Sequence, residues 1–325
     1  LVLARVEGDP EGVKGISLFA VPKVLPDFSR NKAFAGSIEE KMGIHGSPTC
    51  VMNFDGAVGF LIGERCKGLQ GMFIMMNELR LGCAIHGLSQ SELAYQNALQ
   101  YAKDRIQSKS AVNLSGPAVP IITHPDIRRM LMDVRSINEA ARLLVLEAAT
   151  LVDKGGEEAE DRLGLMTPVL KGVLTDYGVD NAIKMQQVLG GHGYVREWGM
   201  EQIVRDARIA MIYEGANGIQ ALDLVGRKLP KNMGRAVTRF FKDTEAELTL
   251  AYHEPIYHLV QPMTQAVSEL KQATEWLAAN GMKNPNDAGG ASYDYMKMFG
   301  LVLLGLAHIR ICLATDDKDR HNTAE

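Results

Sequence analysis

The stretch that decides the fold reads Gln187-Val-Leu-Gly-Gly-His-Gly-Tyr194, then Val195-Arg-Glu-Trp-Gly-Met-Glu-Gln-Ile-Val-Arg-Asp-Ala-Arg208, then Ile209-Ala-Met-Ile-Tyr-Glu-Gly215. Its three clustered glycines, Gly190, Gly191 and Gly193, open the backbone at a helix end and leave amide N–H groups available to a phosphate or a ring. The spacing is not Gly-x-Gly-x-x-Gly and no strand precedes it, which excludes a Rossmann dinucleotide site. A bare glycine cluster is most often a helix end and turn, so its meaning depends on the residues around it.

Helical patterns surround this stretch on both sides. Helices are predicted over residues 72–109, 125–154, 168–190, 216–228, 263–280 and 295–314. Proline in a first turn marks two of the starts, at His124-Pro125 and at Thr167-Pro168, and residues 284–290 are predicted to form a loop. Long helices of this kind favour a bundle.

The first 60 residues or so follow a different pattern. Short apolar runs with β-branched and aromatic residues, bounded by Gly and Pro, predict strands near Leu1–Val6, Gly15–Val21 and Thr49–Phe54. This is too little β-structure to close a stable sheet alone. The predicted fold is therefore mostly α: a β fragment, then a bundle of long helices, then a smaller helical extension.

The composition of the chain argues against several classes of function. The chain has 325 residues with 35 Lys plus Arg against 39 Asp plus Glu, a net charge of -4 that argues against a nucleic-acid binder. Its four cysteines form no zinc or disulfide pattern, which indicates a reducing compartment. His253 and His258 are five residues apart with Pro255 between them, so no metal site is predicted. The apolar run 298–307 is about half the length that spans a bilayer, so no membrane span is expected.

The glycine-rich stretch resembles the signature of the acyl-CoA dehydrogenase family. Three segments match its pattern with the spacing intact, namely Gln187–Tyr194, Glu201–Arg208 and Ile212–Gly215. Further segments resemble the family in the same order, namely Lys41–Thr49 with Phe54-Asp55, Asn77–Arg80 and Tyr101–Arg105. The sequence after Glu214, together with the helical extension beyond Pro230, is similar to a larger bacterial branch of the family.

The resemblance implies three domains in this chain, and it implies that the chain begins inside the family's middle β-domain. These are a partial middle β-domain at 1–62, a four-helix bundle domain at 63–232 and an additional helical domain at 233–325. A family member begins with an all-helical domain and the first half of the β-domain, so we expect this chain to be a fragment. Whether the fragment binds FAD or is active on its own is not readable from the sequence.

The resemblance also implies FAD-dependent α,β-desaturation of an acyl-CoA thioester. A carboxylate removes the pro-R α-proton while the β-hydrogen leaves as hydride to flavin N5. By the family motif Glu214 is the base, and its apolar neighbours Met211 and Ile212 suit a site that excludes water. The implied cofactor-binding residues are Arg105, Gln187, Gly190 and Gly191, and the implied substrate-binding residues are Asn77, Arg80, Tyr213 and Gly215. Acyl chain length depends on cavity depth and is not readable from the sequence.

Several positions depart from the family pattern. Ala216 stands where the family has Thr, His45 where it has Arg and Asn77 where it has Asp, while Ser108 and Lys109 stand in place of Phe and Gly. Flavin contacts of those side chains are in question, but the base is not affected.

The implied partners are an electron-transferring flavoprotein and further copies of the chain, as a homodimer or homotetramer. The implied location is a bacterial cytoplasm, with the mitochondrial matrix as the alternative. A second hypothesis is a non-catalytic binding protein on the same fold, for example one associated with DNA, although the acidic net charge argues against it.

Overall fold

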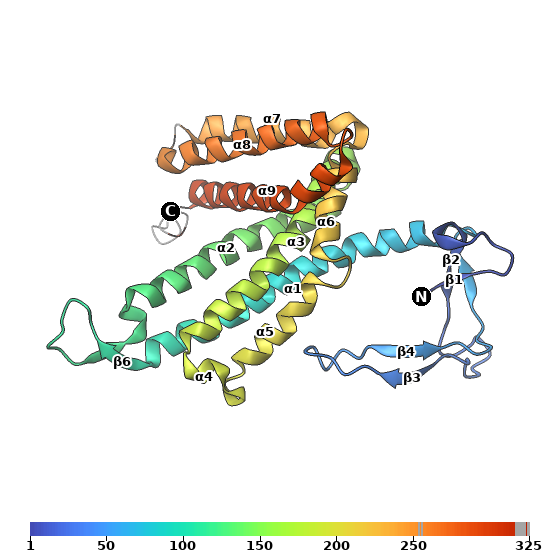
Figure 1. Ribbon diagram of the computed structural model, residues 1–325, viewed down its shortest axis with the longest axis horizontal. Helices are drawn as coiled ribbons and strands as arrows, with labels where there is room; N and C mark the ends of the chain where they lie inside the picture. The colour runs from blue at the N-terminus through green and yellow to red at the C-terminus, as the bar shows by residue number, and fades with distance from the viewer. Residues whose placement is uncertain (253, 255, 316–322, 324–325) are drawn as a thin grey trace. The chain divides into compact units, whose positions relative to one another are not determined.

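The computed structural model describes residues 1–252, 254, 256–315 and 323. The chain forms two compact units, Leu1–Leu79 and Arg80–Glu325, which are described separately below (Figure 1). The predicted class is confirmed, because the chain is mostly helical and its strands are few, short and concentrated near the N-terminus. The three-domain division at 62 and 232 stays a prediction.

The N-terminal unit is built from short antiparallel strands. Their bounds are β1 Val2–Arg5, β2 Ile16–Ala20, β3 Phe34–Ile38, β4 Cys50–Asn53 and β5 Phe60–Ile62, with the 3-10 helix η1 at Gly12–Gly15. One sheet has the order β1-β2-β5, and β3 pairs with β4 across a register shift. The predicted strands correspond to β1, β2 and β4. The sequence did not indicate β3, because all five of its residues are exposed and no apolar alternation marks a buried face.

The larger unit is a helical assembly. Its helices are α1 Gly68–Asp104, which begins in the first unit, α2 Pro125–Lys154, α3 Gly156–Val188, α4 Gly191–Tyr194, α5 Met200–Arg208, α6 Asn217–Asp223, α7 Arg235–Ala251, α8 Tyr257–Asn280 and α9 Pro285–Ala314. Short elements connect them: strands β6 Ile106–Lys109 and β7 Ala118–Pro120, 3-10 helices η2 Ile121–Thr123, η3 Arg196–Trp198, η4 Ile209–Met211 and η6 Lys231–Gly234, and the π-helical η5 Leu224–Lys228. The predicted helix 72–109 therefore ends earlier than expected, because residues 106–109 pair with β7 instead.

Helices α3 and α9 begin ten or more residues before their predicted starts. Pro168 lies inside α3 and not at its beginning, since α3 already begins after Gly155. Pro168 has no backbone N–H and so leaves one hydrogen bond of this helical turn unmade. In the same turn the Thr167 hydroxyl donates to the Leu163 carbonyl at 2.8 Å. Helix α9 begins ten residues early, in the segment predicted as a loop, because Pro285 occupies its first turn and the Asn284 side chain accepts from the Asn286 N–H at 3.1 Å.

The C-terminal helices share one core with the bundle. Residues of α1, α2 and α3 pack in the same buried cluster as residues of α7, α8 and α9. Helix α9 is long and apolar enough to cross a membrane by length and composition alone, but 61% of its most apolar window is buried inside the protein, as in a core helix. Among the described residues no other helix meets that test.

Helices α1 and α3 touch backbone to backbone. A Cβ on Gly87 would lie 2.3 Å from the Leu174 carbonyl oxygen, and a Cβ on Gly178 would lie 2.9 Å from the Gly87 Cα. Both positions therefore need glycine so that the helices can approach this closely. Cys83 and Arg80 of α1 lie near enough to Lys171 of α3 to affect its pKa.

We predict that Gly87→Ala destabilises the protein by about 1–3 kcal/mol, because the added methyl group forces the two helix backbones apart. Gly82→Ala in the same helix is the matched control, since Gly82 is exposed and a Cβ there would meet no atom within 4 Å. That change should raise stability by up to about 1 kcal/mol through helix propensity. Denaturant unfolding of both variants measures the difference, and equal effects would contradict a tight helix crossing.

Candidate functional site

The segment from Ile212 to Ala216 forms a loop between η4 and α6, here termed the base loop. Glu214 has φ +55° and Gly215 has φ +88°, so two consecutive residues adopt the left-handed region. Glutamate rarely adopts it, and such backbone persists only where the surroundings hold it. Gly215 is required twice over, because a Cβ there would also lie 2.6 Å from the Gln220 Nε2. That nitrogen donates to the Gly215 carbonyl at 3.0 Å and holds the middle of the loop.

Tyr213 anchors the start of the base loop. Its hydroxyl and the His86 Nδ1 share a hydrogen bond of 3.0 Å, and the two rings meet edge to face. Burial, with a smaller contribution from neighbouring Cys83, raises the pKa of Tyr213 to about 12, so its hydroxyl keeps its proton. Burial also lowers the pKa of His86. The sequence did not single out His86 or Cys83, because nothing in their local pattern marks them.

Lys171 of α3 lies beneath the base loop and is fully buried. Its Nζ donates to the Asn217 Oδ1 at 2.7 Å. Burial lowers the pKa of Lys171 to about 8, while nearby Cys83, Asp176 and Glu214 favour its charged form and Arg80 opposes it. A fully buried lysine this close to the base loop is the second feature of the site that sequence reasoning missed.

Arg80 is buried on the same side, with 4% of its surface exposed. Its Nη1 lies 3.1 Å from the Asp223 Oδ2, and Asp223 also pairs with Arg227. The Arg80 Nε and the Gln220 Oε1 are buried without a hydrogen-bond partner in the described residues. Unsatisfied buried polar atoms are rare and mark places where a further group can bind.

The glycine-rich turn forms a second centre. Arg105, Gln187, Gly190 and Gly191 all line one cavity of about 490 Å³. Gly190 has φ +57°, so the chain turns sharply at the end of α3. The Gly190 N–H donates to the Gln187 carbonyl at 3.0 Å, whereas Gly191 begins α4. A guanidinium beside the backbone N–H of a helix start is suited to an anion such as a phosphate. The four predicted cofactor residues are therefore brought together.

His192 in the same turn is held by two aromatic residues. Its Nδ1 shares a hydrogen bond of 3.0 Å with the Tyr101 hydroxyl, and its ring stacks on Trp198 with centroids 4.5 Å apart. Tyr101 meets Trp198 edge to face. This cluster fixes the turn from α3 towards α5, and the sequence did not indicate it.

The predicted site residues thus fall into two groups. Arg80, Tyr213, Glu214 and Gly215 cluster at the base loop, and Arg105, Gln187, Gly190 and Gly191 cluster at the glycine turn. Helix α5, nine residues long, adds roughly 14 Å of helix length between them. Asn77 lies in the part of α1 that belongs to the N-terminal unit, where it is exposed. Met211 is half-buried and Ile212 is exposed, so these neighbours do not by themselves form the expected water-free surrounding.

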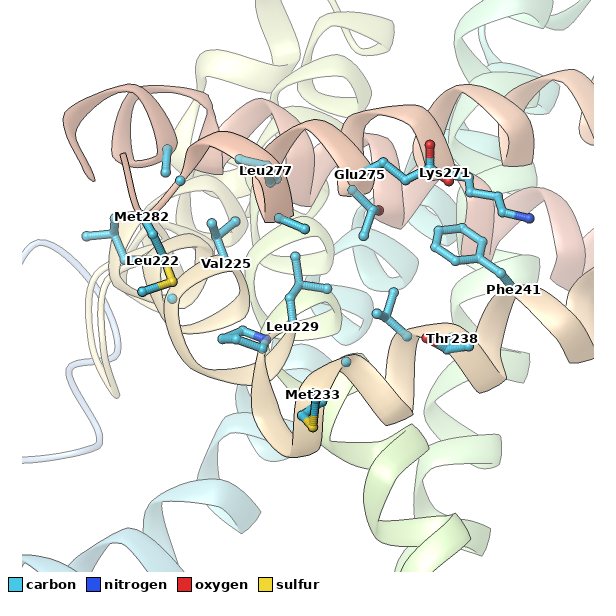
Figure 2. A pocket seen from close by; sticks show the side chains of 18 of the residues that line it. Leu222, Val225, Leu229, Met233, Thr238, Phe241, Lys271, Glu275, Leu277 and Met282 are labelled. Atoms are coloured by element: carbon cyan, nitrogen blue, oxygen red, sulfur yellow. The ribbon is translucent and has the colours of Figure 1, made fainter. Parts of the chain in front are cut away.

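A larger cavity than that at the glycine turn lies elsewhere, with a volume of about 1050 Å³. It is lined by apolar side chains such as Leu229, Val225 and Phe241, with Lys271 and Glu275 at one end (Figure 2). It contains none of the residues predicted for catalysis or cofactor binding. We therefore do not place the chemistry there.

No cluster of three or more His, Cys, Asp or Glu suited to a metal ion occurs in the part of the chain that the structure describes. Of the histidine pair considered as a metal motif, His253 lies outside the described residues.

Known proteins resemble this chain over nearly its whole length. Residues 67–229 match the family model described as acyl-CoA dehydrogenase, C-terminal domain, and residues 236–325 match the model described as acetyl-CoA dehydrogenase C-terminal like. The 3-methylmercaptopropionyl-CoA dehydrogenase of Ruegeria pomeroyi is 39% identical over 320 residues, which covers 94% of this chain and 54% of that protein. The chain spans about half the length of the curated relatives that it matches.

Solved structures share the fold. ACDH-11 of Caenorhabditis elegans in complex with C11-CoA superposes with a TM-score of 0.85 at 21% identity, covering 99% of this chain and 55% of that one. An acyl-CoA dehydrogenase from Bacillus anthracis complexed with FAD superposes with a TM-score of 0.79 at 20% identity, covering 99% of this chain and 56% of that one.

The buried Lys171 should make stability depend on pH. Its pKa is lowered to about 8 in the folded protein, so the charged side chain is disfavoured by folding below that pH. The penalty is fully present below pH 8 and is released as pH rises towards the unfolded value of about 10.4. Relative to that of Lys171→Met, the free energy of unfolding of the unmodified protein should rise by up to about 3 kcal/mol between those pH values.

Denaturant unfolding at pH 7.5 and pH 10 measures this gain, and Lys103→Met on an exposed face of α1 controls for the loss of one lysine. A difference between Lys171→Met and the unmodified protein that stays constant with pH would contradict the buried-cation description.

Proposed function

Since this chain belongs to the acyl-CoA dehydrogenase family, we propose that it carries the base and part of the flavin site of an FAD-dependent enzyme that desaturates acyl-CoA thioesters. The observation that carries the proposal is the base loop. Glu214 is held in a left-handed backbone conformation by ordered neighbours on both sides, as expected for a group that must meet a substrate at a defined position.

In this mechanism the Glu214 carboxylate removes a proton from the α-carbon of the thioester. The electron pair of that C–H bond forms the double bond as the β-hydrogen departs with its own electron pair, so the substrate loses one proton and one hydride. When bound, FAD supplies the hydride acceptor at N5. Removal of a proton by a positioned carboxylate accelerates such a step by about 10²- to 10⁴-fold.

The residues around the base loop support this role. Gly215 lets the loop lie against Gln220 and Arg80, because no side chain projects from it. Tyr213 keeps its proton and so can donate a hydrogen bond, and Arg80 has a buried Nε without a partner in the described residues. We propose Asn77, Arg80, Tyr213 and Gly215 as the substrate-binding residues.

The glycine turn fits the phosphate part of a flavin dinucleotide. Arg105 offers a cation and Gly191 a backbone amide at the start of α4, and neither Gly190 nor Gly191 places a side chain in the cavity of about 490 Å³. Gln187 lines the same space and adds an amide that can both donate and accept. We propose these four residues as the part of the FAD site that this chain contributes.

The wider setting is proposed on the same basis. Several bacterial relatives of the chain are named acyl-CoA dehydrogenases, so we propose a bacterial cytoplasmic enzyme that works as a homodimer or homotetramer. Its electrons pass to an electron-transferring flavoprotein. We propose that the 325 residues are one part of a longer enzyme and are inactive alone, because the relatives are nearly twice as long.

We predict that Glu214→Gln abolishes reduction of the flavin by acyl-CoA while leaving FAD bound. The amide keeps the shape of the side chain but cannot accept the proton, so the rate constant for bleaching of the visible flavin absorbance should fall by about 10²- to 10⁴-fold. The measurement is anaerobic stopped-flow absorbance on the longest form of the protein that its gene encodes, with a series of acyl-CoAs.

Glu197→Gln, at an exposed glutamate of η3, is the matched control and should bleach at the unmodified rate. Loss of activity in both variants would argue against a specific base. A full gene product that binds no flavin and bleaches with no acyl-CoA would instead support a non-catalytic binding protein on this fold.

A further inference from the structure

A buried chain of hydrogen bonds joins the C-terminal helices to the base loop. Helix α9 packs against α3 and α6 (Figure 1). From α9 the Tyr293 hydroxyl donates to the Asp176 Oδ2 at 2.6 Å, and the Asp176 Oδ1 accepts from the Asn217 Nδ2 at 2.7 Å. Asn217 is the first residue of α6 and follows Glu214 by three positions. A single carboxylate therefore connects Tyr293 of α9 with the residue at the exit of the base loop.

Asn217 is the centre of this chain and is 4% exposed. Its amide nitrogen also lies within hydrogen-bond distance of the Gly172 carbonyl and the Thr175 hydroxyl, and its Oδ1 accepts from the Lys171 Nζ. Because a buried amide cannot replace a lost partner with water, its surroundings define one orientation. The start of α6 is thereby fixed against α3.

The base loop is held at three points. Tyr213 is bound to His86 at the entry, the Gly215 carbonyl is bound to Gln220 in the middle, and Asn217 is bound to α3 at the exit. Asp176 is one of the groups that hold the exit, and its second oxygen accepts from Tyr293 of the C-terminal helices. A carboxylate held at both oxygens keeps a single rotamer, whereas one held at a single oxygen can rotate.

The surroundings of Tyr293 hold its ring and leave its hydroxyl free to donate to Asp176. The Lys297 Nζ lies 5.2 Å from the centroid of its ring, a cation–π contact that steadies the ring without using the hydroxyl. Burial, and then the bond to Asp176, raises the pKa of Tyr293, so the hydroxyl remains a donor. Replacement by Phe would keep the ring contact and remove only the hydrogen bond.

We propose that Tyr293 is a positioning residue for the base: through Asp176 and Asn217 the C-terminal helices set the position of Glu214. The proposal rests on the proposed function of Glu214 for its catalytic consequence. It gives the C-terminal region an indirect effect on the reaction, in addition to its share of the core.

The test compares Tyr293→Phe with Tyr295→Phe. Tyr295 lies in the same helix, is 3% exposed and shares a hydrogen bond of 2.7 Å with the Thr274 hydroxyl of α8. Both variants lose one hydrogen-bonded tyrosine hydroxyl of α9, partly buried at Tyr293 and fully buried at Tyr295, but only Tyr293 connects to Asn217. In the full gene product, Tyr293→Phe should lower kcat about tenfold with KM changed less than about twofold, while Tyr295→Phe leaves both near their unmodified values.

A second readout does not need activity. Hydrogen exchange of a peptide covering residues 209–220 reports the opening of the base loop in the protein without substrate. Tyr293→Phe should speed that exchange by about tenfold, and Tyr295→Phe should leave it unchanged.

The two readouts separate the possible outcomes. Faster exchange and lower kcat in Tyr293→Phe alone support the proposal. Unchanged exchange in Tyr293→Phe, or equal effects of the two variants on kcat, overturns it. If Glu214→Gln retains full activity while Tyr293→Phe still speeds exchange, the connection to the loop stands and the assignment of Glu214 as base fails.

Discussion

The site depends on the direct backbone contact of α1 and α3 at Gly87 and Gly178. With no side chain between them, the two helices bring His86 of α1 to Tyr213 in the base loop and Lys171 of α3 to Asn217 at its exit. Any larger residue at the crossing would separate those groups by the width of a methyl group or more, and hydrogen bonds lose most of their strength over such a displacement. Close packing is therefore the condition for the polar contacts of the site.

The support of the base loop differs from the rest of the core. Elsewhere α2, α3 and α9 share a core of aliphatic and aromatic side chains, which tolerate small shifts, with polar contacts such as Arg310 with Glu147 outside it. Beneath the loop the buried groups are polar, namely Arg80, Lys171, Asn217, Gln220 and Asp223. Hydrogen bonds are directional, and a buried polar group must keep its partners, so this layer specifies position where apolar packing alone would not. A buried lysine reduces stability near neutral pH, and its neighbours compensate through charge and hydrogen bonding.

Local patterns predicted most of the helices and missed the points where tertiary contacts override local preference. The start and end of α2 follow from Pro125 and Gly155, whose backbone preferences act within a few residues. The prediction of a helix start at Pro168 is wrong because the surrounding bundle holds α3 together across it. The early start of α9 was missed because Gly289 and Gly290 resemble a loop, yet Pro285 and the Asn284 cap begin a helix that packing sustains.

By itself the sequence determined the helical class, the family and the identity of the glycine turn and the Tyr213–Glu214–Gly215 segment, because each rests on residues that are close together in the chain. Only the tertiary structure decided what supports that segment. Lys171 and Asn217 are 46 positions apart, and Tyr293 and Asp176 are 117 apart. Such pairs form when helices pack at one particular angle and depth, and neither partner carries a local pattern that names the other. The left-handed backbone at Glu214 likewise results from these long-range contacts, since glutamate alone disfavours it.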